Sequence, residues 1–229
     1  MRQRPVSPTR VSGFLRPGAT MGGMTNRAEM FFDPACPWAW MTSRWLMEAA
    51  QVRDLEVTWS VMSLSVLNEG RDLDADYRAF NDGAWLGPRS IIAATKDLPE
   101  GEANTLRKKM YDAYGRRIHL EGRGTSDYPA LVAEVVEELG LDPQLVEVAQ
   151  GDSVDTELRA SHQRAMDLVG DEVGTPVISV EGVAFFGPVV TPAPKGEAAG
   201  KLWDGCVLVA GTPGFYELKR TRDAGPDFS

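Results

Sequence analysis

A cysteine-proline pair stands at the point where a short apolar strand gives way to a helix. Met30-Phe31-Phe32 is typical of a strand and 33–35 of a turn. Residues 37–51 are typical of a helix, and proline is common at the first position of a helix. This order puts Cys36 at the N-terminus of the helix. Because unpaired main-chain N–H groups and the helix dipole stabilise a thiolate there, we expect Cys36 to have a lowered pKa and to act as a nucleophile.

Length and composition narrow the classes of protein that fit. The 229 residues are 43% hydrophobic, which is enough for one core that carries a sizeable insertion. No apolar run approaches the length needed to cross a bilayer, so we expect no association with a membrane. The two cysteines, Cys36 and Cys206, form no disulfide framework and fit a reducing cytoplasm.

Charge divides the chain into a basic start and an acidic remainder. Residues 1–27 hold five arginines and no acidic residue, and we expect a disordered basic tail. Met21 and Met24 leave two interpretations open, a misassigned start codon and a functional basic arm. The remainder holds 19 basic against 33 acidic residues, a net charge of −14. This charge argues against nucleic acid and anionic membranes as partners.

Hydrophobic periodicity predicts the order of the elements. After the first strand and helix we expect, in order, a strand at 55–61, helices at 75–85, 88–96, 102–118, 128–139, 143–150 and 155–169, strands at 177–180 and 183–186, and a helix at 196–209. The opening strand, helix and strand predict a parallel pair. The whole order predicts an α/β, thioredoxin-like fold with an all-helical insertion. Its first part is 28–73, the insertion is 74–152, and its second part is 153–229.

Gly174-Thr175-Pro176 stands directly before the third expected strand. Thioredoxin-like proteins place a cis-proline at this point, facing the active cysteine. A cis bond there leaves neighbouring main-chain groups free to pair with an extended thiol substrate. By itself the tripeptide is more typical of an ordinary turn. Together with Cys36-Pro37 at a helix start, it favours a redox site.

Several blocks that lie far apart in the chain match one known family. The blocks are Phe32-Asp33-Pro34-Ala35-Cys36-Pro37-Trp38, Ser43-Arg44-Trp45, Val61-Met62-Ser63-Leu64, Leu67-Asn68-Glu69, Arg117-Ile118-His119, Gly174-Thr175-Pro176, Gly182-Val183-Ala184-Phe185-Phe186-Gly187-Pro188 and Ala199-Gly200-Lys201-Leu202-Trp203-Asp204. Over 29–222 the chain thus resembles the actinobacterial mycothiol-dependent nitroreductases, which are DsbA-like oxidoreductases with a thioredoxin fold. The resemblance implies a cytoplasmic enzyme that uses mycothiol, the small thiol of actinobacteria, and in some members reduces nitroaromatic compounds.

Ala39 departs from the pattern of that family. The family motif is Cys-Pro-Trp-Cys, in which the second thiol resolves the mixed disulfide that the first one forms. With alanine there, Cys36 can still attack, but an external thiol has to release it. We therefore expect a thiol-disulfide oxidoreductase, a mycothiol-dependent reductase with a monothiol cycle through Cys36. Pro37, Thr175 and Pro176 would position the incoming thiol, small disulfide or electrophilic substrate.

Four further residues are candidates for the site. Trp38 is expected over its mouth, where it would shield the thiolate or stack on an aromatic substrate; the alternative is core packing. Asn68 and Tyr77 match family positions near the active site and would bond the thiol, or they are an ordinary turn residue and helix residue. His119 also matches, although a structural histidine at a helix end is favoured. His162 is expected to be partly exposed.

The remaining motifs argue against other cofactors. Two histidines and two cysteines are scattered without ligand spacing, so we expect no metal site. Neither a dinucleotide-binding fingerprint nor a P-loop is present, so flavin and nicotinamide have no recognisable motif. Electrons are expected to arrive as mycothiol, regenerated by a separate NADPH-dependent reductase. Cys206 shares a helix face with apolar residues, which favours a structural role over replacement of the lost thiol.

Two other functions stay open at this point. Kappa-class glutathione transferases and hydroxychromene carboxylate isomerases share the helix-inserted fold and lack paired cysteines, so a thiol transferase or isomerase that activates a bound low-molecular-weight thiol is one alternative. The other is a non-catalytic thiol-binding or redox-sensing protein. The pKa of Cys36 bears on the second alternative, because a value near that of an ordinary thiol favours a non-catalytic protein and a clearly lowered value favours retained chemistry. The sequence specifies no oligomeric state.

Overall fold

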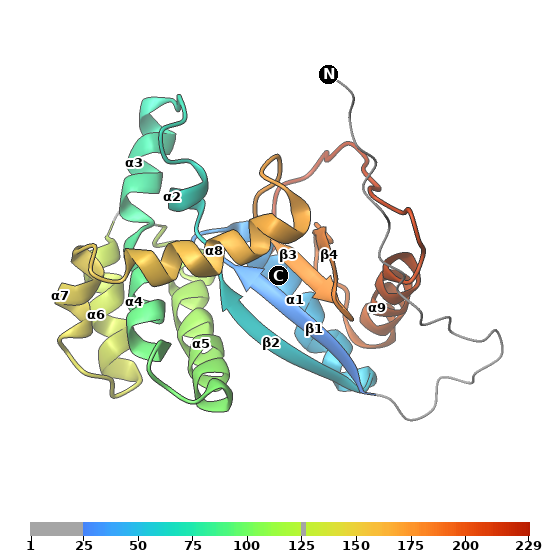
Figure 1. Ribbon diagram of the computed structural model, residues 1–229, viewed down its shortest axis with the longest axis horizontal. Coiled ribbons are helices and arrows are strands. Elements are labelled where there is room, and N and C mark those ends of the chain that lie inside the picture. The colour runs from blue at the N-terminus through green and yellow to red at the C-terminus, as the bar shows by residue number, and fades with distance from the viewer. Residues whose placement is uncertain (1–24, 125–126) are drawn as a thin grey trace, which may run out of the picture.

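The sheet combines strands from the two ends of the chain. The computed structural model describes residues 25–124 and 127–229. Its four-stranded sheet has the order β2-β1-β3-β4, formed by β1 (Asn26–Phe32), β2 (Leu55–Val61), β3 (Val177–Val180) and β4 (Val183–Phe186) (Figure 1). β1 is parallel to β2 and antiparallel to β3, with Phe31 opposite Val177. The expected parallel pair and the β3-β4 hairpin are both present.

Central β1 is apolar on both faces, so helices cover the sheet on both sides. Met30 and Phe32 join the large core cluster that contains Trp45 of α1 (Pro37–Val52). Phe31, between them, joins a second cluster with Met166 of α8 (Asp155–Val169). Because alternate side chains of a strand point to opposite faces, α1 and α8 lie on opposite sides of β1. α9 (Gly196–Ala210) packs beside α1.

The helices that come between β2 and α8 in the sequence form a group beside the sheet (Figure 1). These are α2 (Leu64–Leu67), α3 (Ala75–Gly83), α4 (Leu86–Thr95), α5 (Glu100–Gly115), a π-helical turn (Arg116–Leu120), α6 (Tyr128–Glu138) and α7 (Leu145–Gln150). The side chain of Asn104 on α5 fixes them to the edge of the sheet. It accepts the N–H of Trp59 at 2.7 Å and donates to the carbonyl of Val57 at 3.1 Å. An edge strand is thereby paired by a helix.

The structure differs from the sequence prediction mainly at element ends. β1 begins at Asn26, inside the expected tail, and the remainder of that tail, 1–24, lies outside the described residues. The expected helix 102–118 ends at Gly115 and continues as the π-helical turn, and α2 was not predicted. α2 has one turn, too short for a periodic signal; Ser63 caps it by accepting the N–H of Val66 at 3.3 Å.

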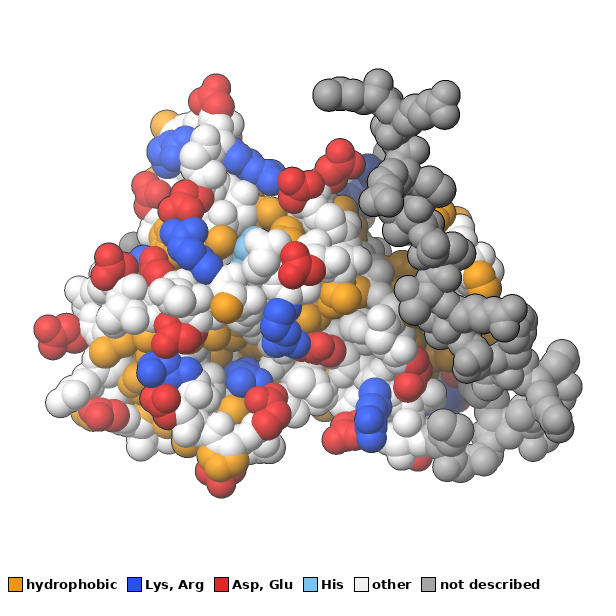
Figure 2. Space-filling model, in the orientation of Figure 1, with side chains coloured by type: hydrophobic (Ala, Val, Ile, Leu, Met, Phe, Trp, Pro, Cys, Tyr) orange, Lys and Arg blue, Asp and Glu red, His pale blue; other side chains and the backbone are white. Residues whose placement is uncertain are grey.

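Surface charges of both signs are interspersed. On the face shown in Figure 2, Lys and Arg side chains alternate with Asp and Glu side chains over the helices, and orange apolar side chains lie between them. Within the described part of the chain, no helix is long and apolar enough to cross a membrane.

Gly115 provides a test of the packing between α5 and α1. A Cβ added there would lie 2.1 Å from the ring of Trp40, which is 3% exposed. We expect Gly115→Ala to lower the free energy of unfolding by about 1–3 kcal/mol, because overpacking forces the ring to shift. Urea denaturation followed by circular dichroism measures the change.

Gly205 is the matched control, because a Cβ added there meets nothing within 4 Å and the position is inside α9. We expect Gly205→Ala to raise the free energy of unfolding by up to about 1 kcal/mol, since alanine is the better helix former. Equal effects of the two substitutions would contradict this account of Gly115.

Candidate active site

Cys36 lies at the N-cap of α1, as the sequence predicts. Its Sγ accepts the N–H of Ala39 at 3.4 Å, and the thiol donates to the main-chain carbonyl of Thr175 at 3.4 Å. The Thr175-Pro176 peptide bond is cis, as expected, and directly precedes β3. Thus the two motifs, which lie far apart in the sequence, meet at the cysteine sulfur.

The pKa of Cys36 is raised, whereas the sequence predicts a lowered pKa. Burial raises it to about 12, and the nearby carboxyl group of Asp33 raises it further; the Ala39 N–H lowers it, but by less. The side chain is only 5% exposed. A helix N-terminus stabilises a thiolate only as far as the loss of water permits, and here desolvation is the larger effect. In this conformation Cys36 is therefore a protonated thiol.

Asp33 is the site residue that sequence reasoning missed. Its carboxyl group is fully buried and accepts the N–H of Ala35 at 2.8 Å and that of Leu64 at 2.7 Å. These bonds join the turn before Cys36 to the segment after β2. Burial raises the pKa of Asp33 to about 7, although both N–H groups oppose the change. The sequence signal that could have identified Asp33 is its position as an acidic residue between an apolar strand and a proline.

Pro37 and Trp38 lie at the surface of the first turn of α1, and both are half-buried. The guanidinium of Arg222 lies over the indole of Trp38, 5.1 Å from the ring centre. Thr42 donates to the carbonyls of Trp38 at 2.9 Å and Pro188 at 2.8 Å. Through these two bonds Thr42 links the loop after β4 to the first turn of α1.

Asn68 and Tyr77 lie together in one hydrogen-bond network. The amide of Asn68 donates to the Tyr77 hydroxyl at 3.3 Å and to Oδ1 of Asn81 at 3.1 Å. Asn68 and Asn81 are buried, whereas Tyr77 is 39% exposed and stacks on Phe80. Asn81 completes this network without having had a motif of its own in the sequence.

The two histidines hold main-chain groups. His119 lies in the π-helical turn and donates from Nε2 to the carbonyl of Pro34 at 2.9 Å, so it braces the turn before Cys36. Burial lowers its pKa to about 4. His162 was expected to be partly exposed, but it is buried, and its Nδ1 accepts the N–H of Ser63 at 3.4 Å. The periodicity of α8 could not show that β2 and α2 cover this side chain.

Neither Ala39 nor Cys206 supplies a second thiol beside Cys36. The methyl group of Ala39 is fully buried within the first turn of α1. Cys206 is a free cysteine, half-buried in α9, and burial raises its pKa to about 11. It packs against the large core cluster, as the sequence pattern suggests. Among the described residues no group of three or more His, Cys, Asp or Glu side chains is placed to hold a metal ion.

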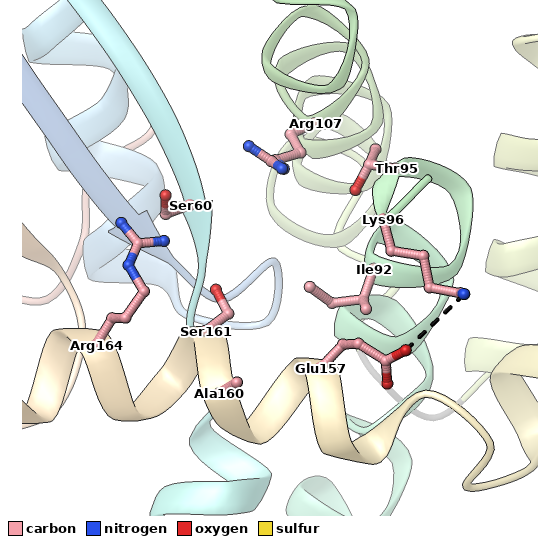
Figure 3. Close-up of a pocket in the computed structure, with 9 residues that line it drawn as sticks. All are labelled: Ser60, Ile92, Thr95, Lys96, Arg107, Glu157, Ala160, Ser161 and Arg164. Atoms are coloured by element: carbon pink, nitrogen blue, oxygen red, sulfur yellow. Dashed lines mark ion pairs between the residues drawn. The ribbon is translucent and has the colours of Figure 1, made fainter. Parts of the chain in front are cut away.

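A separate cavity of about 220 Å³ lies between β2, α4, α5 and α8 (Figure 3). Its lining residues are Ser60, Ile92, Thr95, Lys96, Arg107, Glu157, Ala160, Ser161 and Arg164. None of them is a predicted site residue. Each of the three cations already has a carboxylate partner, namely Lys96 with Asp97 and Glu157, Arg107 with Glu100, and Arg164 with Glu29. Their charges are balanced without a bound anion.

The buried carboxyl group of Asp33 makes stability depend on pH. Its pKa is about 7 in the folded protein against an ordinary 3.8, so between these values the folded state holds a proton that the unfolded state releases. This contribution to stability is present below about pH 4 and is lost as the pH rises to about 7. The asparagine side chain in Asp33→Asn cannot ionise, so this variant does not lose that contribution to stability as the pH rises.

We expect wild type to become less stable relative to Asp33→Asn by on the order of a few kcal/mol between about pH 4 and about pH 8. Urea denaturation of both proteins at several pH values measures the difference, in which the contributions of other groups cancel. Parallel stability profiles of the two proteins would contradict the assignment.

Comparison with known proteins identifies the family of the chain. The model of the family described as mycothiol-dependent nitroreductase Rv2466c matches residues 35–220. Rv2286c of Mycobacterium tuberculosis, an uncharacterised protein, is 29% identical over 195 residues, which cover 85% of this chain and 81% of that protein.

Two solved structures show the same fold. Chlamydia trachomatis DsbA superposes with a TM-score of 0.50 at 10% identity, covering 87% of this chain and 100% of that one. A candidate protein disulfide isomerase from Nitrosomonas europaea gives a TM-score of 0.51 at 16% identity, covering 81% and 98%. The predicted thioredoxin-like fold with a helical insertion is confirmed. With most of its length matched by the family model, the chain belongs to the Rv2466c-like family of mycothiol-dependent nitroreductases.

Proposed function

We propose that this protein is a mycothiol-dependent thiol-disulfide oxidoreductase that works by a monothiol cycle through Cys36. One observation carries the proposal: the Cys36 thiol lies at a helix N-cap and faces the Thr175 carbonyl beside a cis-proline, while a buried alanine occupies the place of the resolving cysteine. The family to which the chain belongs supports mycothiol as the thiol.

The cycle needs one protein sulfur and two mycothiol molecules. The substrate is a mixed disulfide between mycothiol and another small thiol. Cys36 attacks the mycothiol sulfur, the disulfide bond breaks, and the other thiol leaves with the proton that Cys36 gives up. A second mycothiol then attacks the Cys36–mycothiol disulfide as a thiolate, which frees Cys36 and forms oxidised mycothiol. One disulfide is thereby exchanged for another, and the substrate thiol is released reduced.

The surrounding residues have separate parts in this proposal. Thr175 and Pro176 present main-chain groups to the entering disulfide, and Pro37 and Trp38 form the floor on which it lies. The insertion, 74–152, contributes Tyr77, which is 39% exposed and whose hydroxyl accepts a bond from Asn68; in this proposal the hydroxyl donates to the bound thiol. His119 acts through the Pro34 carbonyl as a positioning residue. A reductase that draws on mycothiol would work in the cytoplasm.

The first test is the mixed disulfide itself. On exposure to oxidised mycothiol, we expect wild type to gain the mass of one mycothiol and to lose it when reduced mycothiol is added. Cys36→Ser should gain nothing. Cys206→Ser is the matched control and should gain the same mass as wild type. An unmodified Cys36, found by intact-protein and peptide mass spectrometry, would end the proposal.

The second test restores the missing sulfur. Ala39 is fully buried one turn from Cys36, so Ala39→Cys places a thiol where it can attack the mixed disulfide from within. We expect the mycothiol adduct to stop accumulating in this variant, because the internal disulfide replaces it. Ala39→Ser controls for the added volume and should keep the adduct. If both variants accumulate the adduct to the wild-type level, the geometry of resolution is wrong.

The protonated state of Cys36 favours a second candidate function. A thiol with a pKa of about 12 that donates to the Thr175 carbonyl is a hydrogen-bond donor at neutral pH. If its one proton turned from the Thr175 carbonyl to a bound mycothiol, such a group would stabilise the mycothiol thiolate, which would itself attack an electrophile, as in a transferase or isomerase. Serine can donate the same bond. Turnover that survives Cys36→Ser would select this function over the monothiol cycle, and mycothiol binding without turnover would select a non-catalytic thiol-binding protein.

A further inference from the structure

The chain beyond α9 returns to the candidate active site. In Figure 1 the segment 211–229, here called the C-terminal strap, leaves α9, follows the upper edge of the molecule and ends near its middle. It has no helix or strand. Two of its side chains, Tyr216 and Leu218, are 87% and 81% exposed, so these two residues do not pack into the hydrophobic core.

The last eight residues of the strap nevertheless contact both sides of the turn that holds Cys36. Arg222 lies over the indole of Trp38, two residues after the cysteine. Phe228 lies against the ring of His119, with 5.6 Å between ring centres. His119 in turn bonds the carbonyl of Pro34, two residues before the cysteine. The strap is therefore fastened to a residue that follows Cys36 in the sequence, Trp38, and to His119, which bonds a residue that precedes it.

A third attachment holds the end of the strap in place. The N–H of Asp227 donates to Oγ1 of Thr191 at 2.8 Å, and that hydroxyl donates to the carbonyl of Gly225 at 3.4 Å. Thr191 belongs to the loop after β4, which Pro188 and Thr42 tie to the first turn of α1. Only 36% of Phe228 is exposed, although it is the penultimate residue of the chain.

We infer that Arg222 and Phe228 are specificity-determining residues, which hold the strap over Cys36 and thereby limit the size of the thiol or disulfide that reaches it. Cys36 is 5% exposed in this structure, and on this inference an entering substrate displaces the contacts of Arg222 and Phe228. The attachments suit this role. A cation over an exposed ring and a half-covered aromatic side chain are weak enough to open and strong enough to keep the closed state in the majority.

The inference rests on the proposed function only for the nature of the entering thiol. Reagents that alkylate cysteine test it without mycothiol, so its failure is distinguishable from failure of the monothiol cycle. When opening is fast, the rate of alkylation follows the open fraction of the molecule. Two probes of different size, iodoacetamide and fluorescein maleimide, report access for a small and a bulky substrate.

We expect Arg222→Ala and Phe228→Ala each to speed alkylation of Cys36 by iodoacetamide about three- to five-fold, because one attachment is lost. The gain with fluorescein maleimide should be larger than the gain with iodoacetamide. Arg222→Lys keeps the charge but loses the flat guanidinium, so its rates should lie between those of wild type and Arg222→Ala. Peptide mass spectrometry measures each cysteine separately.

Two controls are built into the chain. Tyr216→Ala and Leu218→Ala change exposed residues of the same strap and should leave both rates at the wild-type level. Cys206, half-buried in α9, reports general loosening in every sample, and its rate should stay constant. Unchanged Cys36 rates in Arg222→Ala and Phe228→Ala would overturn the inference. So would equal acceleration at Cys36 and Cys206, or equal gains for the small and the bulky probe.

Discussion

The buried carboxyl group of Asp33 joins the two segments on which the candidate site is built. One oxygen accepts the N–H of Ala35, in the turn that leads to Cys36, and the other accepts the N–H of Leu64, at the start of α2. Without these bonds one buried and one partly buried main-chain donor would lack partners, and an unsatisfied buried donor costs about 1–3 kcal/mol. His162 serves the same α2 segment through Ser63, and His119 serves the turn through Pro34. The position of the cysteine sulfur therefore depends on groups from β1, α2, α8 and the π-helical turn together.

Burial opposes the reactivity that this position supplies. The N-cap gives Cys36 one N–H bond and the positive end of α1, an effect of typically less than about 1 kcal/mol. Removing a thiolate from water costs more, and the neighbouring Asp33 carboxyl group adds to that cost, so the thiol stays protonated in the closed structure. Chemistry at Cys36 thus requires either water or a substrate dipole to reach the sulfur. Access and activation are in this sense the same event.

Local signals were enough to predict the fold, whereas long-range contacts decided the behaviour of the site. Two short motifs were found where the sequence predicts them: Pro37 begins α1, and Gly174-Thr175-Pro176 directly precedes β3 with a cis bond before Pro176. The pKa of Cys36 depends on how far tertiary packing removes it from water, and no spacing within 30–51 encodes this. His162 illustrates the same limit, because its partner, the N–H of Ser63, comes from a segment far from its own helix in the sequence. The contacts of Arg222 with Trp38 and of Phe228 with His119 link residues that lie more than 100 positions apart in the chain, beyond the reach of periodicity.

Ala39 and the C-terminal strap have a common chemical logic. With two thiols, a mixed disulfide is short-lived, because the second sulfur attacks it from within. In the proposed monothiol cycle, with Ala39 in that place, the mixed disulfide would persist until a second small thiol arrives, and during that time any thiol that can reach Cys36 would compete for it. A cover that opens for one size of thiol limits this competition in both half-reactions, the attack on the substrate and the release of the adduct. A buried thiol under a weakly held strap is therefore consistent with a one-cysteine cycle, whereas an exposed low-pKa thiol would leave the adduct open to every small thiol.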